Sequence, residues 1–227
     1  MTGLGLVSVL VPAYETERYI AEALESALAQ DYPHVEIIVA DDGSADRTAA
    51  IAESLGVRTL RCPHRGPAAA RNAALACSSG DYVTVLDSDD VWPVDRLSAQ
   101  VGYLAQHPEH DLVLGLTRVF SNPGEERPQH YPLVRGEGDV PAVAGTALAR
   151  RRVFDAVGGW DASLLLAEDI DWLARAKDAG FASGALDHVV LHYRIHAGNT
   201  SRHTNANKQA LLGVLRASVR RQHTADA

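Results

Sequence analysis

The chain has 227 residues, of which 46% are hydrophobic, and this length suits one large domain or one domain with two lobes. Its formal net charge of -8 argues against a nucleic-acid binder, because such proteins usually present a basic face. The two cysteines, Cys62 and Cys77, have neither the number nor the spacing of a zinc site or a disulfide framework. The sequence also lacks a basic leader and an apolar run of about 20 residues, so we expect a cytoplasmic protein without a spanning helix.

The first half of the chain alternates between strand patterns and helix patterns. Short apolar runs predict strands at residues 6–11, 35–40, 57–61 and 82–86. Amphipathic stretches and helix-start residues predict helices at residues 17–30, 45–55, 67–77 and 93–106. This order favours an α/β fold with a mainly parallel central sheet and helices on both of its faces.

The second half is less regular. Its pattern predicts a strand at residues 112–120, a long polar loop at 121–141, helices at 147–157 and 168–179, an edge strand at 189–195 and a final amphipathic helix at 205–221. A polar loop of that length often carries a function.

Three carboxylates follow the fourth predicted strand, in the run Asp87-Ser88-Asp89-Asp90. Carboxylates this close repel one another unless water or a cation surrounds them. Hard oxygen ligands suit Mg²⁺ or Mn²⁺, and these cations keep coordination sites free for diphosphate oxygens. A solvated acidic turn before the next helix is the alternative. At the carboxyl end of a strand, where open α/β sheets bind ligands, we favour the metal site.

Three further polar clusters follow the other predicted strands, and each has a structural alternative. In Asp41-Asp42-Gly43-Ser44, a carboxylate accepts a hydrogen bond from a base or a ribose, or Ser44 simply caps the next helix. Tyr14 covers a nucleobase, or it is a core aromatic residue. Arg71 meets phosphate, or it forms a surface ion pair. Taken together, four clusters at adjacent strand ends favour one shared ligand site.

The order of these motifs resembles that of family 2 glycosyltransferases, which have the GT-A fold. Each segment alone is a weak match, but the set is specific and spans nearly the whole chain. The matching segments are Val9-Leu10-Val11-Pro12-Ala13-Tyr14, Asp41-Asp42-Gly43-Ser44, Gly66, Ala70-Arg71-Asn72, Gly80-Asp81-Tyr82-Val83, Leu86-Asp87-Ser88-Asp89-Asp90, Gly158-Gly159-Trp160-Asp161, Glu168-Asp169-Ile170-Asp171-Trp172 and Tyr193-Arg194-Ile195-His196. The resemblance implies a single GT-A domain, with a Rossmann-like nucleotide-sugar-binding half at residues 1–106 and a smaller acceptor-binding half at residues 107–227.

The resemblance also implies an activity and roles for individual residues. The activity is an inverting, metal-dependent transfer of a sugar from a nucleotide diphosphate, a UDP-sugar first of all, to an acceptor hydroxyl. Asp169 corresponds to the catalytic base, and Asp41 corresponds to the residue that contacts the nucleobase. The ligands of the Mn²⁺ or Mg²⁺ ion are expected among Asp89, Asp87 and His196, with His192 as the alternative histidine, and Asp87 also corresponds to the residue that meets the ribose. The remaining donor-site residues are Pro12, Ala13, Tyr14, Glu15, Gly66, Arg71 and Ser88.

Asp169 stands at the predicted start of a helix, and this position bears on its chemistry. A carboxylate within hydrogen-bond reach can take the proton of the attacking hydroxyl. The helix dipole favours the charged carboxylate and lowers its basicity, so burial must oppose the dipole if Asp169 is the base. The alternative is that Glu168 and Asp169 are only N-terminal helix residues.

The sequence leaves the acceptor open as a glycan, a lipid-linked sugar, a peptide or a small molecule. The predicted final helix carries the basic residues Lys208, Arg216, Arg220 and Arg221 beside apolar ones. Such a helix lies peripherally on the inner face of a membrane, or it packs on the domain with its basic side in solvent, and we favour packing. The sequence is also compatible with an oligomer.

Two other functions compete with glycosyl transfer. One is a catalytically silent module that binds a sugar nucleotide, although the intact acids Asp87, Asp89 and Asp169 argue against it. The other is a nucleotidyltransferase, which is expected to have a glycine-rich phosphate loop where this chain has Pro12-Ala13-Tyr14-Glu15.

Overall fold

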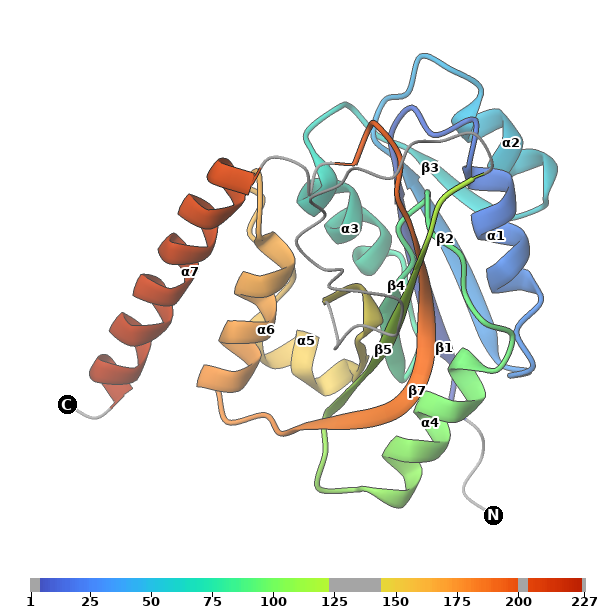
Figure 1. The fold of residues 1–227 in the computed structure, drawn as a ribbon. Coiled ribbons are helices and arrows are strands. Elements are labelled where there is room, and N and C mark those ends of the chain that lie inside the picture. The colour runs from blue at the N-terminus through green and yellow to red at the C-terminus, as the bar shows by residue number, and fades with distance from the viewer. Residues whose placement is uncertain (1–4, 123–143, 200–203, 226–227) are drawn as a thin grey trace.

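A seven-stranded sheet lies at the centre of the structure, a computed structural model that describes residues 5–122, 144–199 and 204–225 (Figure 1). The strand order is β3-β2-β1-β4-β6-β5-β7. The strands are β1 (Val7–Ala13), β2 (Val35–Asp41), β3 (Arg58–Arg61), β4 (Tyr82–Val85), β5 (Leu112–Phe120), β6 (Leu148–Arg150) and β7 (Ser183–Arg194). The helices are α1 (Ile20–Leu28), α2 (Thr48–Ser54), α3 (Pro67–Ala76), α4 (Arg96–Gln106), α5 (Arg151–Val157), α6 (Glu168–Asp178) and α7 (Thr204–Ala225), with a 3-10 turn η1 (Ala144–Thr146).

All strands of this sheet except β6 point the same way. Strand β1 pairs in parallel with β2 and β4, β2 with β3, and β5 with β7, while β6 is antiparallel to both β4 and β5. The predicted mainly parallel sheet is therefore confirmed. In the register of β1 and β2, Ala13 lies opposite Asp41, so the segments that follow these strands meet at one edge of the sheet. This is the edge at which open α/β sheets bind ligands.

Strand β1 shows how helices cover both faces of the sheet. All of its residues are buried, and successive side chains point to opposite faces. Val7, Val9 and Val11 pack in one hydrophobic cluster with residues of α1 and α4. Leu10 packs in a second cluster with residues of α3, α5 and α6. Burial on both faces explains why this strand is a nearly continuous apolar run in the sequence.

The helix predicted at residues 147–157 is wrong in its first part. Residues 144–146 form η1, Leu148–Arg150 form β6, and the helix α5 begins only at Arg151. Strand β6 fills the gap between β4 and β5, where Leu148 lies opposite both Thr84 and Val113 and is fully buried. A short apolar run does not distinguish a strand from a helix, so the pairing partners decide its conformation.

Strand β7 is longer than the edge strand predicted at residues 189–195. It begins at Ser183, lies at the end of the sheet and pairs in parallel with β5. The polar loop predicted at residues 121–141 falls almost entirely on residues 123–143, outside the described residues. The remaining predicted elements are present, with ends that differ by a few residues.

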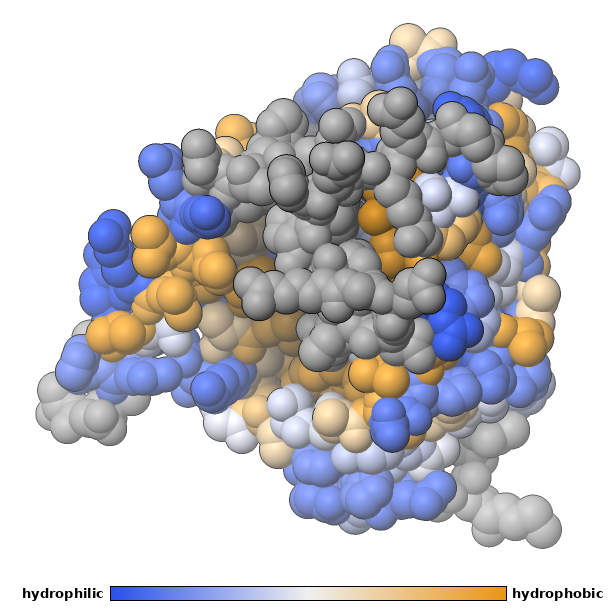
Figure 2. All heavy atoms as spheres, viewed as in Figure 1, coloured by the Kyte–Doolittle hydropathy of each residue, from blue (hydrophilic) through white to orange (hydrophobic). Residues whose placement is uncertain are grey.

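Helix α7 packs on α6 along one side and exposes apolar residues on the other. Asp178 of α6 accepts hydrogen bonds from Ser218, Arg221 and Gln222, and Val214 is buried. The exposed apolar residues are Leu211, Leu212, Leu215 and Val219, and Figure 2 shows hydrophobic atoms at the surface over this helix. Packing on α6 fits the alternative that we favoured, but the exposed side is more apolar than we expected. None of the helices in the described ranges is long and apolar enough to cross a membrane.

Candidate active site

A cleft with a volume of about 390 Å³ opens at the edge of the sheet where β1, β2, β4 and β7 end. Its walls come from the segments after these strands and from the first residues of α3 and α6. The structure brings together in this cleft most of the site residues expected from the sequence: Pro12, Ala13, Tyr14, Glu15, Gly66, Arg71, Asp87, Ser88, Asp89 and His196. Three other expected residues do not line the cleft, namely Asp41, Asp169 and His192.

Asp87 and Asp89 follow β4 and contact two different partners. Asp87 Oδ1 lies 2.9 Å from a terminal nitrogen of Arg71. Asp89 Oδ2 lies 2.8 Å from Nε2 of His196, which follows β7. Asn199, which no sequence pattern indicated, lies 3.4 Å from the same carboxylate oxygen. The side chains of Asp87 and Asp89 are 38% and 24% exposed, so both carboxylates remain accessible from the cleft.

Asp90 turns into the interior of the protein and away from the cleft. Its side chain is buried, and its Oδ1 accepts the backbone N–H of Arg194 at 2.8 Å. Burial and, to a smaller degree, the neighbouring Asp89 and Asp87 raise the pKa of Asp90 well above its usual value. A solvated acidic turn therefore does not describe this segment, because one of its three carboxyl groups lies in the core.

Arg194, the last residue of β7, ties the aspartate segment to the rest of the domain. Its Nε donates to the backbone oxygen of Asp89 at 2.7 Å, and its guanidinium donates to Glu22 of α1 at 2.6 Å. The sequence motif at this strand end includes Arg194, but no sequence pattern indicated that Arg194 bonds to Asp89 and Glu22. His192 lies two residues earlier and forms a backbone bridge, so His196 is the histidine that contacts Asp89.

Tyr14 and His64 form an aromatic platform on one wall of the cleft. Their ring centroids are 4.1 Å apart at an angle of 25°, and Tyr14 is 45% exposed, so it is not a core aromatic residue. Nδ1 of His64 lies 2.9 Å from Asp42, and the Asp42 carboxylate accepts the backbone N–H groups of Arg65 and Gly66, each at 2.8 Å. Gly66 has a φ of 92°, which glycine adopts without strain. Such a flat aromatic surface beside a carboxylate suits the stacking and orientation of a nucleobase.

Asp41 lies behind this wall. It is 2% exposed, its Oδ2 accepts the backbone N–H of Ser44 at 3.3 Å, and its Oδ1 has no hydrogen-bond partner within the described ranges. The neighbouring Asp42 is the aspartate of this pair that lines the cleft. The Ser44 hydroxyl accepts the backbone N–H of Glu15 at 2.9 Å, whereas α2 begins only at Thr48. Ser44 therefore links the segments after β1 and β2 and does not cap the helix.

The guanidinium of Arg71 lies buried between carboxylates at the floor of the cleft. One terminal nitrogen pairs with Asp87, and the other forms a short ion pair with Glu168. Burial lowers the pKa of Arg71, but Asp87, Glu168 and Asp169 raise it by more, so the group stays charged. The surface ion pair considered for Arg71 is in fact a buried one. No sequence pattern linked Arg71 to Glu168, because the two residues are 97 positions apart.

Asp169 faces a second, smaller cavity beside the cleft. This cavity has a volume of about 40 Å³, shares Arg71 and Asp87 with the cleft and is also lined by the rings of Phe154, Trp160 and Trp172. Burial raises the pKa of Asp169 and Asp87 adds to the rise, whereas Arg71 opposes it. A raised pKa is the direction that a base at the start of a helix requires. Ala167 has a φ of 61°, a left-handed conformation that is uncommon outside glycine and often occurs at functional sites.

Asp87, Asp89 and His196 offer carboxylate and imidazole donors, which fit Mn²⁺ and, through the carboxylates, Mg²⁺. Among the described residues, these three donors do not form a group within 4.8 Å of one another. They are therefore not a closed cage made by the protein alone. Cations that act on nucleotides are commonly held by one or two carboxylates and completed by phosphate oxygens, and this pair of aspartates fits that mode.

Comparisons with known proteins point to one family. Residues 8–158 match the family model described as glycosyl transferase family 2. A relative from Escherichia coli, the UDP-Glc:alpha-D-GlcNAc-diphosphoundecaprenol beta-1,3-glucosyltransferase WfaP, is 37% identical over 134 residues, which cover 53% of this chain and 53% of the relative. The chain therefore spans about half the length of this curated relative.

Solved structures of two glycosyltransferases share the fold. The mannosyltransferase PcManGT from Pyrobaculum calidifontis, in complex with GDP-Man and Mn²⁺, has a TM-score of 0.76 and 23% identity over 96% of this chain and 65% of that chain. S. aureus TarS in complex with UDP-GlcNAc has a TM-score of 0.70 and 24% identity over 92% of this chain and 65% of that chain. The GT-A fold implied by the sequence motifs is thereby confirmed.

Proposed function

This chain belongs to glycosyl transferase family 2, and we propose that it transfers a sugar from a nucleotide diphosphate to an acceptor hydroxyl with inversion at the anomeric carbon. One observation carries the proposal. An accessible aspartate, Asp87, which is followed two residues later by the accessible Asp89, and an enclosed aspartate, Asp169, lie around the guanidinium of Arg71 at the ligand-binding edge of the sheet. The accessible pair suits a cation and a diphosphate, and the enclosed group suits a proton acceptor.

The donor in this proposal is a UDP-sugar, whose base lies on the wall beside β1 and β2. The platform of Tyr14 and His64 offers a face on which the base stacks. Asp42 lines the cleft beside this platform and holds His64 through its carboxylate, whereas the family resemblance assigned the contact with the base to the neighbouring Asp41. The name of WfaP includes UDP-Glc, and TarS was solved with UDP-GlcNAc, so both relatives support uridine as the nucleoside.

In this proposal Asp89 and Asp87, with His196 beside them, would hold Mn²⁺ or Mg²⁺ and, through it, the diphosphate. When bound, such a cation neutralises the charge that develops on the diphosphate leaving group. Two sets of contacts within the chain orient the carboxylates that would bind the cation. His196 and Asn199 orient the Asp89 carboxylate, and the buried guanidinium of Arg71 orients Asp87. The PcManGT complex, which contains Mn²⁺, supports a divalent cation in this fold.

Asp169 is the proposed base. The acceptor oxygen bonds to the anomeric carbon as the bond from that carbon to the diphosphate oxygen breaks, and the hydroxyl proton passes to the Asp169 carboxylate. A single displacement from the opposite face inverts the configuration and needs no covalent intermediate. The raised pKa of Asp169 supports this role, because a base works best when its pKa approaches the working pH.

The proposed acceptor is a glycan or a lipid-linked sugar, and α7 offers a surface for a membrane. The name of WfaP includes a diphosphoundecaprenol acceptor. On α7, Leu212, Leu215 and Val219 line an exposed apolar surface beside Arg216 and Arg220. Apolar and basic groups together suit an anionic bilayer surface. We expect the chain to sediment with anionic vesicles and a Leu212→Asp/Leu215→Asp variant to stay in the supernatant. A wild-type protein that stays in the supernatant would exclude the contact.

A screen of nucleotide sugars with Mn²⁺ tests the central proposal. We expect one or a few donors to raise the melting temperature, because a ligand that binds the folded state stabilises it. Incubation of that donor with glycan and polyprenyl-linked acceptors should then yield a product whose anomeric configuration, read by NMR, is opposite to that of the donor. A donor that binds without transfer or hydrolysis would favour the silent module, and retention of configuration would exclude Asp169 as a simple base.

A further inference from the structure

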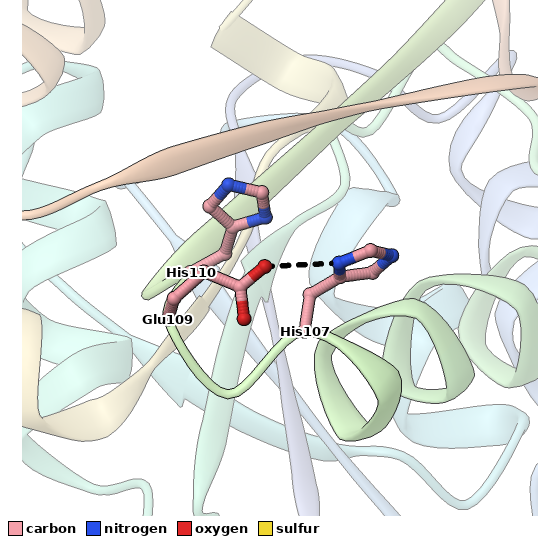
Figure 3. Close-up of side chains that lie close together, drawn as sticks. All are labelled: His107, Glu109 and His110. Atoms are coloured by element: carbon pink, nitrogen blue, oxygen red, sulfur yellow. Dashed lines mark hydrogen bonds and ion pairs between the residues drawn. The ribbon is translucent and has the colours of Figure 1, made fainter.

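Three metal-ligating side chains gather in the turn between α4 and β5, away from the cleft. His107 follows the last residue of α4, and Glu109 and His110 come just before β5. One donor atom from each residue lies within 4.8 Å of the other two. Figure 3 shows the Glu109 carboxylate pointing at the His107 ring, with the His110 ring beside it. The proposed function does not use any of these residues.

The backbone of this turn is held at both ends. The N–H of His107 bonds to the carbonyl of Tyr103 within α4 at 3.0 Å, and the N–H of His110 bonds to the carbonyl of His107 at 3.0 Å. Asp111 then anchors the start of β5, since its carboxylate accepts the backbone N–H of Ala182 at 3.1 Å. The three side chains are therefore presented by a fixed turn, which reduces the entropy that a ligand must overcome.

Tyr103 orients both imidazole rings. Its ring stacks on His107 with centroids 4.3 Å apart, and its hydroxyl lies 3.1 Å from Nδ1 of His110. Histidine ligands of metals usually have such a hydrogen-bonded neighbour, which fixes the ring and its tautomer. Glu109 lies 3.0 Å from Nδ1 of His107.

Two imidazoles and one carboxylate are a typical donor set for zinc. Hard cations such as Mg²⁺ prefer oxygen donors, whereas imidazole suits Zn²⁺ and its neighbours in the transition series. With zinc bonds of about 2.1 Å, neighbouring donors in a tetrahedral site are about 3.4 Å apart, so donors within 4.8 Å of one another must approach by at most about 1.4 Å. The side chains of His107 and Glu109 are 42% and 61% exposed, which leaves room for this rotation and for a water ligand.

We propose that His107, Glu109 and His110 bind a Zn²⁺ ion that ties the end of α4 to the start of β5. This site is separate from the cleft. The turn precedes the amino end of β5, whereas the cleft lies at the carboxyl ends of the parallel strands, and Figure 1 shows the turn after α4 on the opposite side of the sheet from those ends. A cation there stabilises the folded chain without taking part in sugar transfer.

Zinc titration of the full chain carrying Asp89→Ala tests the proposal, because this background weakens the proposed cation site in the cleft. We expect isothermal calorimetry to show one equivalent of Zn²⁺ and no comparable binding of Mg²⁺. The melting temperature should rise with Zn²⁺ in the same background. A protein that binds no zinc in this background would overturn the proposal.

Variants of the turn then locate the ion. His107→Ala/His110→Ala and the single, exposed Glu109→Gln should each weaken zinc binding by about tenfold or more, and Tyr103→Phe should weaken it by about tenfold. His34→Ala, an exposed histidine elsewhere, is the matched control and should bind zinc as before. Unchanged affinity in Glu109→Gln and in the double variant would place the ion elsewhere and refute the site. Because Asp89→Ala is present throughout, this result is independent of whether the cleft transfers sugar.

Discussion

Two groups of carboxylates, Asp87 with Asp89 and Glu168 with Asp169, lie around the cleft and the cavity beside it, and they differ in their surroundings more than in their chemistry. The side chains of Asp87 and Asp89 are 38% and 24% exposed, whereas that of Glu168 is 9% exposed and burial raises the pKa of Asp169. An open cleft lets carboxylates stay charged and exchange water for a cation. An enclosed cavity lined by aromatic rings increases the proton affinity of the same group. The comparison teaches that the surroundings set by the fold can give chemically identical carboxyl groups different proton affinities.

Replacing the enclosed carboxylate should have the largest effect. Asp169→Asn keeps the shape of the side chain but cannot accept the proton, so we expect kcat to fall by about 10²- to 10⁴-fold while donor affinity stays near that of the wild type. Steady-state kinetics and calorimetry with the nucleoside diphosphate measure the two quantities. Asp155→Asn, an exposed aspartate on α5, is the control. Near-normal turnover in Asp169→Asn would assign proton transfer to another group.

Replacing an accessible carboxylate should act on binding first. Asp89→Ala removes a proposed cation ligand, and we expect the Mn²⁺-dependent affinity for UDP to fall by about a hundredfold, since even indirect partners of metal ligands are worth 10- to about 100-fold. Calorimetry with Mn²⁺ and with EDTA separates the metal-dependent part. Equal affinities of wild type and variant in Mn²⁺ would show that the accessible pair is not the cation site.

A substitution in the wall of the cleft that is proposed to bind the nucleobase should have a smaller effect on the affinity for UDP. Tyr14→Ala removes the exposed ring that stacks on His64, and loss of a stacked base contact costs about 1–3 kcal/mol, so the Kd for UDP should rise by about tenfold or more. Tyr14→Phe keeps the ring and should bind UDP nearly as well as the wild type. An unchanged Kd in Tyr14→Ala would place the nucleobase away from this platform.

The dependence of kcat/KM on pH should show the smallest change near neutrality, and it reports on the protonation of Asp169. Because burial raises the pKa of Asp169, kcat/KM should begin to fall, as the pH is lowered, above the value of about 3.9 for an ordinary aspartate. Arg71 lowers this pKa, so Arg71→Gln should move the acid limb to still higher pH. An acid limb at or below the ordinary value would contradict the buried base.

The contribution of Asp169 to folding stability should change with pH in the direction opposite to kcat/KM. The folded state favours the protonated form of Asp169, so this contribution to stability is present below the unfolded-state pKa and is lost as the pH rises through the raised folded-state pKa. Asp169→Asn removes the charge that is unfavourable at neutral pH. Its melting temperature at pH 7 should therefore equal or exceed that of the wild type, and a clearly lower value would argue that the carboxylate is structural.

The sequence predicted the first half of the fold better than the second for a physical reason. Strands β1 and β2 are long, and β1 is buried on both faces, so their own apolar runs are enough to predict them. Strand β6 has three residues, and its conformation depends on partners in β4 and β5. The same distinction applies to the site. Asp87 and Asp89 could be predicted because they follow a recognisable strand, whereas the contacts of Glu168 and Asn199 join elements that are distant in the chain.

Arg194 links the last strand of the sheet to two segments from the first half of the chain. It belongs to β7, yet it holds the backbone of Asp89 and the side chain of Glu22, both in the first half of the chain. The segment that carries His196 follows directly, so a displacement of the end of β7 carries this histidine and the aspartate loop with it. The proposed cation ligands Asp89 and His196 are thereby both tied to the end of β7, so a ligand that shifts this strand end is expected to shift both of them.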